Sequence, residues 1–282
     1  MVSSKPDLDQ VVAIALAEDL GERNTDVTTS SVIDADLMGE AIIVARKPGV
    51  LSGSDAAARV FDMIRPRCDY VALSPDGKRL EAGDQVAKIT GPLGTILIGE
   101  RTALNFLQRM SGIATLTRRY ADALAPFPKV TLLDTRKTTP GLRFLERAAV
   151  RAGGGHNHRD GLWDAILIKD NHVAAAGGVT EAVRRARKAA MPVEVEVDTL
   201  AQLAEALESG AEIVLLDNMS TELMRQAVEI TAGRAKLEAS GGMTLEGAVA
   251  AARAGVDRIS VGALTHSAPA LDLSLEVTKT WR

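Results

Sequence analysis

Basic side chains gather in one stretch of this 282-residue chain, between Asp134 and His172. The stretch holds the following cationic or titratable side chains: Arg136, Lys137, Arg143, Arg147, Arg151, His156, His158, Arg159, Lys169 and His172. The whole chain is nonetheless acidic, with a formal net charge of -4. Cations gathered against the overall balance predict a pocket for a small polyanion. Arg143, Arg147 and Arg151 recur at helical spacing and can equally form a solvated or interface stripe.

The run GGGHNHR, residues 153–159, combines a permissive backbone with side chains that bind anions or move protons. This composition exceeds what a simple turn requires. We interpret His156 as structural, which leaves His158 and Arg159 as the functional candidates. A structural zinc site is the less favoured alternative, because the two histidines lie two residues apart without a third ligand at an evident spacing.

The composition is typical of a cytoplasmic globular protein with a large aliphatic core. Hydrophobic residues make up 46% of the chain, aromatic residues only 3%, and Cys68 is the lone cysteine. We predict that Cys68 is a small buried hydrophobe, because nothing nearby in the sequence resembles a base for it. Apolar runs fall short of the ~20 residues that cross a bilayer, and the N-terminus lacks the pattern of a secretion signal. The acidic balance and few aromatics argue against a nucleic-acid partner.

The N-terminal part of the chain predicts an α+β domain over residues 1–112, since its helices and strands do not alternate regularly. The expected elements are a helix over 7–20 ended by Gly21, an extended segment over 26–33, a strand within 39–53, a helix over 54–66, an antiparallel meander over 68–99 and a helix over 99–125 interrupted near Ser111 and Gly112.

After Lys129, short apolar runs alternate with amphipathic stretches, which predicts a parallel sheet with helical crossovers. The apolar runs lie at 130–134, 165–169, 193–197, 212–217, 236–240 and 258–262. Their close spacing favours an incomplete α/β barrel over residues 113–268. An open doubly wound sheet is the alternative, but the Gly-x-Gly-x-x-Gly turn that would support it is missing. Residues 269–282 are expected to return to the first domain as a strand.

The carboxyl ends of barrel strands form the mouth where chemistry occurs. Reading the ends of the apolar runs gives Asp134 with Arg136 and Lys137, Lys169, Glu194 with Glu196 and Asp198, Asp217 with Asn218, Ser240 with Gly241 and Gly242, and Gly262. This order predicts a pocket with a cationic side, a carboxylate side and a backbone-lined side. Glu194 and Glu196 alternate with valines and therefore share a face. If that face is the interior, each carboxylate needs a partner, and Lys169 is the expected partner for one of them. An open strand with a wet acidic face is the alternative.

The segment Ser240–Gly242 precedes a predicted helix and can form a phosphate cradle from backbone N–H groups. Gly262, Thr265 and Ser267 would extend it. A simple turn is the alternative for so short a glycine segment. The position after a late barrel strand favours the cradle, because barrels often hold phosphate there.

The chain resembles the quinolinate phosphoribosyltransferase family in the order and spacing of DTRKTTPGLR, GGGHNHRDGL, LIKDNH, EVEVDT, LLDN, SGG and GALTHS. A molybdenum-transport-associated protein of similar fold shares weaker forms of the first two motifs. The resemblance implies an N-terminal α/β sandwich joined to an incomplete, seven-stranded α/β barrel. It also implies a homodimer, in which Arg101 of the GERT segment reaches the site of the other subunit.

The same resemblance implies roles for individual residues. Those expected to hold the dicarboxylate acceptor are Thr135, Arg136, Lys137, His158, Arg159 and Lys169. Glu196 and Asp217 would face the ribose of phosphoribosyl pyrophosphate and its Mg²⁺, which the donor carries without a direct protein ligand. The residues expected at the 5-phosphate are Ser240, Gly241, Gly242, Val261 and Gly262. The catalytic candidates are Lys137, Lys169, Glu196 and Asp217.

The activity implied is that of a pentosyltransferase in de novo NAD biosynthesis. It would convert quinolinate and phosphoribosyl pyrophosphate to nicotinate mononucleotide, CO₂ and pyrophosphate. Lys169 or His158 is a hypothesis for the group that delivers a proton to C2 after decarboxylation. Two alternatives remain: a related transferase or molybdenum-linked protein with another anionic acceptor, and a non-catalytic anion-binding protein on the same barrel.

Overall fold

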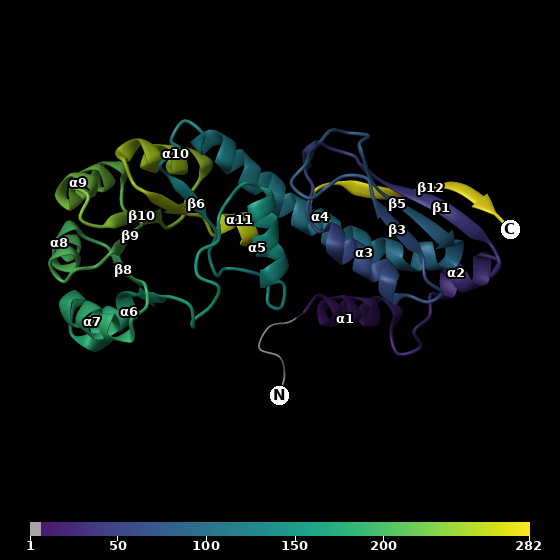
Figure 1. Cartoon of the computed structure of the whole chain (residues 1–282), viewed down its shortest axis with the longest axis horizontal. Helices are drawn as coiled ribbons and strands as arrows, with labels where there is room; N and C mark the ends of the chain where they lie inside the picture. Colours follow the sequence, from purple (N-terminus) through teal and green to yellow (C-terminus); the bar gives the residue numbers. More distant parts are fainter. Residues whose placement is uncertain (1–6) are drawn as a thin grey trace. The chain divides into compact units, whose positions relative to one another are not determined.

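The computed structural model describes residues 7–282 and divides into two compact units (Figure 1). The first contains the described residues up to Arg118 together with residues 138–154 and 268–282, and the second contains residues 119–137 and 155–267. The sequence placed residues 138–154 in the barrel. They belong to the first unit because Glu146, fully buried, accepts hydrogen bonds from Arg109 and from Thr139.

The first unit is built on an antiparallel sheet with the strand order β12-β1-β5-β3. Its strands are β1 (Met38–Ala45), β3 (Asp69–Ala72), β5 (Gln85–Pro92) and β12 (Leu273–Trp281), and a separate pair is formed by β2 (Gly49–Val50) and β4 (Arg79–Leu80). Its helices are α1 (Leu8–Leu20), α2 (Val27–Val32), α3 (Ser54–Met63), α5 (Arg143–Ala152) and most of α4 (Leu93–Leu124). The predicted return of the C-terminal segment is confirmed, since β12 pairs along the whole of β1.

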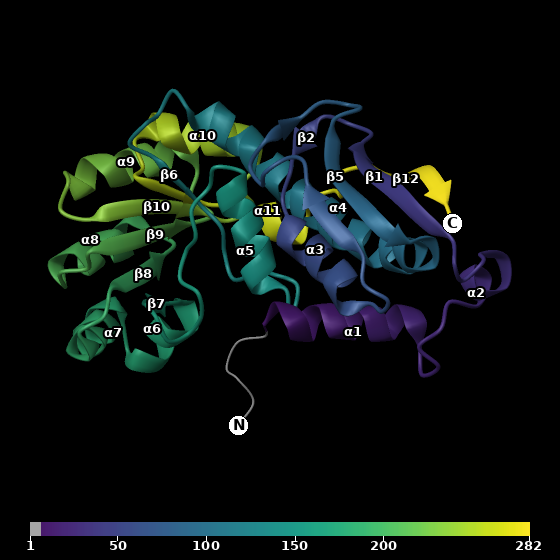
Figure 2. The same cartoon turned by 45° about the vertical axis from the view of Figure 1, so that its right-hand side comes forward.

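Close packing of α3 against α4 covers this sheet (Figure 2). A Cβ atom on Gly99 of α4 would lie 2.6 Å from the ring of Phe61 on α3, so glycine is needed where the helices touch. Cys68 is 2% exposed, and burial, followed by the charge of Asp69, raises the pKa of its thiol to about 11. The predicted role of Cys68 as a small buried hydrophobe is confirmed.

Three local predictions in this unit are wrong. Residues 26–33 are not extended, because the side chain of Asp26 accepts hydrogen bonds from the N–H groups of Thr28 and Thr29 and so starts helix α2. Helix α4 is not interrupted near Gly112. A Cβ atom there would lie 2.1 Å from the carbonyl oxygen of Pro269, so the glycine permits a close chain crossing inside a continuous helix.

The expected meander over residues 68–99 also differs from the structure. Strands β3 and β5 are antiparallel neighbours, but β4 leaves them and pairs with β2, and α4 already begins at Leu93.

Within the described residues of the second unit, six parallel strands form one sheet with the order β6-β11-β10-β9-β8-β7. The strands are β6 (Thr131–Leu133), β7 (Ile166–Ile168), β8 (Val193–Val197), β9 (Ile213–Asp217), β10 (Lys236–Ser240) and β11 (Arg258–Ser260). Each coincides with a predicted apolar run, so the parallel α/β prediction is confirmed. A parallel bridge from His156 to Leu133 adds a single-residue seventh position beside β6.

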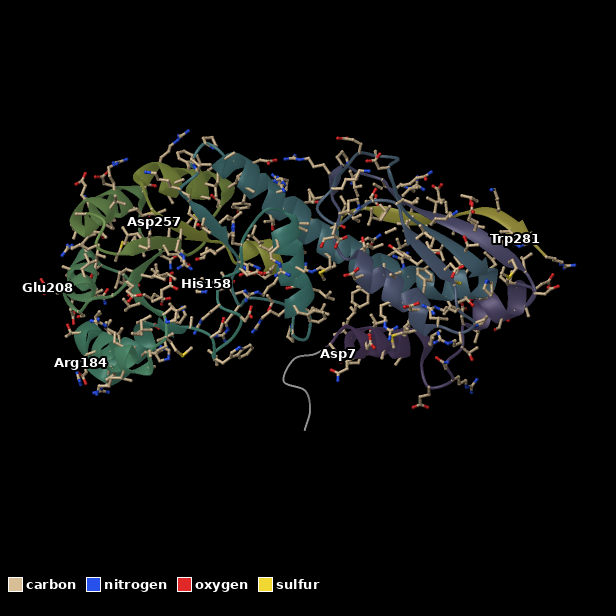
Figure 3. All side chains as sticks on the ribbon, viewed as in Figure 1. Asp7, His158, Arg184, Glu208, Asp257 and Trp281 are labelled. Atoms are coloured by element: carbon tan, nitrogen blue, oxygen red, sulfur yellow. The ribbon has the colours of Figure 1, made fainter. Side chains whose placement is uncertain are left out.

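Helices of the second unit cover the outer face of this sheet (Figure 1). They are α6 (Asp170–Ala176), α7 (Val179–Ala186), α8 (Leu200–Glu208), α9 (Thr221–Thr231) and α10 (Leu245–Ala254), with a 3₁₀ turn η1 (Arg187–Ala189). The short α11 (Ala263–His266) follows the carboxyl end of β11. Figure 3 shows Arg184 and Glu208 on the outer helices and His158 on the inner side of the sheet. Among the described helices of both units, none combines the length and apolar character needed to span a bilayer.

Candidate functional site

The predicted site residues of the second unit follow the carboxyl ends of its strands. Lys137 comes after β6, Lys169 directly after β7, Glu196 near the end of β8, Asp217 and Ser240 at the last positions of β9 and β10, and Gly262 after β11. Because all these strands are parallel, their carboxyl ends share one edge of the sheet. Arg101 belongs to the first unit, where it is exposed on α4.

Lys169 and Glu196 form an ion pair between the ends of β7 and β8. The lysine side chain is 48% exposed and the carboxylate is 10% exposed, so the pair stands at the solvent boundary. The predicted pairing of Lys169 with one of the two glutamates is confirmed. His172 has a structural role here, since its Nδ1 accepts the N–H of Lys169 at 3.0 Å and caps the start of α6.

The ends of β9 and β10 are locked together around Asn218. Its N–H donates to the carbonyl of Ser240 at 3.0 Å, and its side-chain amide donates to the carboxylate of Asp217 at 2.7 Å. A Cβ atom on Gly241 would lie 2.2 Å from the Asn218 side-chain oxygen, so glycine is required for this contact. This arrangement fixes the Asp217 carboxylate beside the glycine turn.

The glycine turn after Ser240 has the backbone of an anion-binding loop. Gly241 and Gly242 both adopt positive φ angles, +93° and +49°, and nothing lies within 4 Å of a Cβ atom built on Gly242. Helix α10 follows, with Thr244 as its N-cap. Successive N–H groups in such a turn, next to a helix N-terminus, favour a phosphate group.

Lys137 is held against the end of β11. The hydroxyl of Thr265 donates to the carbonyl of Lys137 at 2.8 Å, and the N–H of Val261 donates to Leu133 at 3.0 Å. A Cβ atom on Gly262 would lie 3.0 Å from Cδ of Lys137, so the glycine lets the lysine side chain pass. The N–H of Lys137 also donates to the hydroxyl of Thr135 at 3.1 Å.

Asp134 fixes the histidine-containing loop to the end of β6. Its buried carboxylate accepts the side-chain amide of Asn157 at 2.6 Å and the N–H of His158 at 2.8 Å. The sequence marked Asp134 only as the end of an apolar run. Its hydrogen bonds to the loop could not be predicted from the sequence, because its partners Asn157 and His158 lie 23 and 24 residues further along the chain.

The ring of His158 points into the sheet interior rather than toward solvent. Its Nε2 lies 3.0 Å from the Glu194 carboxylate and 3.4 Å from that of Glu238. Burial lowers the pKa of His158, but the hydrogen bonds and charges of the two carboxylates outweigh burial and raise the pKa to about 9. The sequence analysis missed Glu238 and its neighbour Arg258, whose Nε lies 2.9 Å from the Glu238 carboxylate. The sequence did contain one sign of this contact, since Glu238 is a charged residue in the middle of a predicted buried strand, the run KLEAS.

Arg136 and Arg159 lie close enough to influence each other. Burial, and then the charge of Arg136, lower the pKa of Arg159. Neighbouring guanidinium groups repel one another, and an anion bound between them would relieve this repulsion. Arg159 also donates to the carbonyl of Ala165 at 3.1 Å. The arrangement is chemically suited to a carboxylate.

A cavity of about 220 Å³ lies beside the histidine loop in the second unit. It is lined by Asn157, His158, Arg159, Ala165, Ile166, Pro192, Glu194, Ile213 and Arg258. Ile166, Ile213 and Arg258 begin strands, so one side of the cavity lies at the amino ends of the sheet, whereas Arg159 is also within electrostatic range of Arg136, which follows the carboxyl end of β6. His158 and Arg159 therefore connect the interior of the sheet with this cavity.

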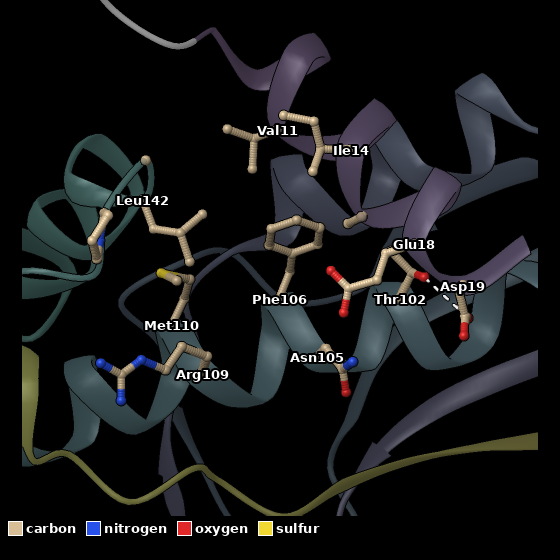
Figure 4. Close-up of a pocket in the computed structure, with 13 residues that line it drawn as sticks. Val11, Ile14, Glu18, Asp19, Thr102, Asn105, Phe106, Arg109, Met110 and Leu142 are labelled. Atoms are coloured by element: carbon tan, nitrogen blue, oxygen red, sulfur yellow. Dashed lines mark hydrogen bonds between the residues drawn. The ribbon is translucent and has the colours of Figure 1, made fainter. Parts of the chain in front are cut away.

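A further cavity, of about 370 Å³, lies in the first unit between α1, α4 and the loop before α5 (Figure 4). Its walls are largely apolar, including Val11, Phe106 and Met110, with Glu18 and Arg109 at its edge. The residues predicted for the acceptor and donor do not line it. We therefore assign the chemistry to the strand ends of the second unit.

Two family models cover most of the chain. The N-terminal domain of quinolinate phosphoribosyl transferase matches residues 26–111, and the C-terminal domain of the same family matches residues 113–276. The chain belongs to the quinolinate phosphoribosyltransferase family. The resemblance seen in the sequence motifs is thereby confirmed.

Named members of the quinolinate phosphoribosyltransferase family align along nearly the whole chain. The probable carboxylating nicotinate-nucleotide pyrophosphorylase of Bacillus subtilis is 44% identical over 93% of this chain and 90% of its own length. The chloroplastic enzyme of Arabidopsis thaliana is 42% identical over 96% and 83%. The structure of the Francisella tularensis nicotinate-nucleotide pyrophosphorylase superposes with a TM-score of 0.91 at 41% identity and covers 96% of each chain.

Proposed function

We propose that this chain transfers the phosphoribosyl group of phosphoribosyl pyrophosphate to quinolinate, with loss of CO₂, to form nicotinate mononucleotide. The observation that carries the proposal is the order of groups along the carboxyl-end rim. Cationic side chains follow β6 and β7, carboxylates end β8 and β9, and a glycine turn ends β10. A dicarboxylate acceptor and a phosphorylated sugar donor require these three surfaces side by side. Family membership points to the same reaction.

Arg136, Lys137 and Arg159 are the proposed ligands of the acceptor carboxylates, with Lys169 at the boundary to the donor. Guanidinium forks suit carboxylates, and lysines supply compact positive charge. Thr135 orients this group through its hydrogen bond from the N–H of Lys137. The interior position of His158 makes it a support for this group, a role developed below.

Glu196, Asp217 and the Ser240–Gly242 turn are the proposed donor site. The turn would receive the 5-phosphate, extended by Val261 and Gly262 after β11. Glu196 and Asp217 present carboxylate oxygens, the ligand type that Mg²⁺ prefers, so these side chains fit a donor that carries Mg²⁺. Bound there, Mg²⁺ would neutralise the departing pyrophosphate.

The proposed reaction needs little covalent chemistry from the protein. The ring nitrogen of the acceptor bonds to C1 of the sugar while the C1–oxygen bond to pyrophosphate breaks. Positive charge develops on the sugar, and Glu196 and Asp217 stabilise it electrostatically. The alkylated, positively charged ring nitrogen then stabilises the carbanion left at C2 as CO₂ departs, and that electron pair takes up one proton. Lys169, whose side chain is 48% exposed, is the proposed donor of this proton.

The direct test is incubation of the purified chain with quinolinate, phosphoribosyl pyrophosphate and Mg²⁺, following CO₂ release and nucleotide formation together. Equal amounts of both products are expected. Turnover of nicotinate without CO₂ would favour the related transferase with another acceptor. Binding of both substrates without turnover would favour an anion-binding protein, and either result would overturn the proposal.

We also propose that the chain acts as a homodimer in which Arg101 completes the partner's site. Arg101 is exposed on a helix of the first unit, whereas the other cations belong to the second unit. Mixing inactive Arg101→Ala with inactive Lys169→Ala chains should restore part of the activity, because some sites then contain both residues. Failure of every mixture to recover activity would contradict a shared site. A cytoplasmic location remains a prediction from composition.

A further inference from the structure

Four charged side chains meet inside the parallel sheet, and we call them the interior cluster: His158, Glu194, Glu238 and Arg258. The Glu194 side chain is 5% exposed and that of Glu238 is fully buried. His158 contacts both carboxylates, at 3.0 and 3.4 Å, and Arg258 contacts Glu238 at 2.9 Å. Nothing in the reaction described above uses these two glutamates or this arginine.

The imidazole ring links the cluster to the chain that carries Arg159. Its Nε2 faces the carboxylates, and its Nδ1 accepts the N–H of Arg159 at 2.8 Å. The residues on either side are also fixed, because Asp134 holds the N–H of His158 and Ala165 holds the Arg159 guanidinium. A substitution of Glu194 or Glu238 that moves the imidazole ring should therefore also move the main chain of Arg159.

The same three ligand-type side chains, His158, Glu194 and Glu238, could suggest a metal site, since their ligand atoms lie within 4.8 Å of one another. The hydrogen bonds argue against it. A metal on Nε2 would move the ring proton to Nδ1, which faces the N–H of Arg159. Arg258 already neutralises Glu238 from the other side. The hydrogen bond to Nδ1 fits a ring that carries its proton on Nε2, between the two carboxylates.

The charges of the cluster also depend on its protonation. With a neutral ring, two carboxylates and one guanidinium carry one net negative charge, which the nearby charge of Arg159 offsets in part at Glu194. A second proton on His158 would neutralise the four-residue cluster. It also competes with the hydrogen bond from Arg159 to Nδ1, so the protonation of the cluster and the anchoring of the Arg159 main chain are linked.

We infer that Glu194 and Glu238 are positioning residues that act through the His158 ring to set the place of Arg159 in acceptor binding. This inference rests on the proposed function, because Arg159 is an acceptor ligand only there. His158 contacts Glu194 from β8, Glu238 from β10, Asp134 directly after β6 and the adjacent Arg159, and Arg258 from β11 reaches it through Glu238. Substitution of Glu238 should disturb the interior cluster most, since Glu238 contacts both His158 and Arg258.

The experiment is steady-state kinetics of Glu238→Gln between pH 6 and pH 10, varying quinolinate and phosphoribosyl pyrophosphate separately. Removing one carboxylate lowers the proton affinity of His158. Protonation of Nδ1 displaces the hydrogen bond from the Arg159 N–H, so kcat/KM for quinolinate should rise with pH through the pKa of His158. In Glu238→Gln this inflection should move to lower pH by about one unit. At pH 10, above the inflection in both proteins, KM for quinolinate should be about tenfold higher in the variant, with KM for the donor within about twofold of wild type, as expected when only a supporting contact is lost.

Glu229→Gln is the matched control, because Glu229 is an exposed carboxylate on α9 outside both the rim and the cluster. Glu194→Gln provides a second test of the cluster should Glu238→Gln fail to fold, as judged by circular dichroism. An unchanged inflection and unchanged quinolinate KM in a folded variant would overturn the inference. So would saturable binding of Zn²⁺ alone that is lost in the variant. A wild-type chain without turnover would instead overturn the proposed function.

Discussion

Glu194 and Glu196 lie two residues apart on the same face of β8, yet they have different surroundings. Glu196 pairs with Lys169, whose side chain is 48% exposed at the rim. Glu194 pairs with His158, whose side chain is 10% exposed in the interior cluster. An ion pair at the solvent boundary is easily rearranged when a charged substrate enters, whereas a buried cluster is costly to break. On β8, Glu196 is therefore placed to act on a bound substrate, and Glu194 is placed to hold the His158 ring.

The largest effect is expected when the buried interior cluster loses its arginine. Arg258→Ala leaves the buried Glu238 carboxylate without its guanidinium, and we expect the free energy of unfolding to fall by about 3 kcal/mol. Urea unfolding followed by circular dichroism measures this. Lys236→Ala is the control, since Lys236 pairs with Asp257 at the surface and should cost under about 1 kcal/mol. Equal losses in the two variants would contradict the assignment of a buried cluster.

Removing Lys169 tests the role of the exposed ion pair with Glu196 at the carboxyl ends of the strands. Lys169→Ala should lower kcat/KM at least about 100-fold, because the protein loses the positive charge that lies between the proposed acceptor and donor sites. Its free energy of unfolding should change by less than about 1 kcal/mol, since the pair with Glu196 is half exposed on the lysine side. Near-normal activity in Lys169→Ala would remove the rim from the mechanism.

The pH dependence of stability sharpens the comparison. The pKa of His158 is raised from 6.5 to about 9 by Glu194 and Glu238 against the opposing effect of burial. The folded chain therefore binds more protons than the unfolded chain between these values, and stability falls as pH rises through this window. We expect a decline on the order of 2 kcal/mol between pH 6 and pH 10 in urea unfolding. Glu238→Gln should flatten it, and an equally steep curve in the variant would assign the decline to other groups.

The smallest expected effect concerns the glycine turn on the rim. Gly241→Ala places a methyl group where the Asn218 side-chain oxygen lies 2.2 Å away, whereas Gly233→Ala, at a similar positive φ, meets nothing within 4 Å. Both substitutions bear the cost of a left-handed backbone, of about 1 kcal/mol. Gly241→Ala should cost about 1 kcal/mol more and should also raise KM for phosphoribosyl pyrophosphate. Identical stability and kinetics in the two variants would show that the turn tolerates a side chain.

The elements that the sequence predicted well are those with a strong local pattern. Buried parallel strands are continuous apolar runs, so the strands from β6 to β11 were located, and Lys169 could be paired with one of Glu194 and Glu196, which the structure shows to be Glu196. Residues 26–33 have the β-branched composition of a strand, but the Asp26 cap overrides it.

The interior cluster was missed for a different reason. The partners of His158 lie on β8 and β10, which are separated by β9 in the sheet, and only the folded structure shows that Glu194 and Glu238 contact the same ring. Asp134 likewise became a clamp only when the loop at Asn157 returned beside β6. Local patterns locate strands, but contacts between distant strands decide which charges meet.

The most direct test of the account compares Glu196→Gln with Glu194→Gln in one set of measurements: kcat, KM for each substrate and the free energy of unfolding. Glu196→Gln should lower kcat at least about 100-fold with little change in stability. Glu194→Gln should lower stability and raise KM for quinolinate, with kcat within about threefold of wild type. The reverse pattern, in which Glu194→Gln abolishes turnover and Glu196→Gln mainly destabilises the fold, would contradict the division of β8 into a chemical and a supporting carboxylate.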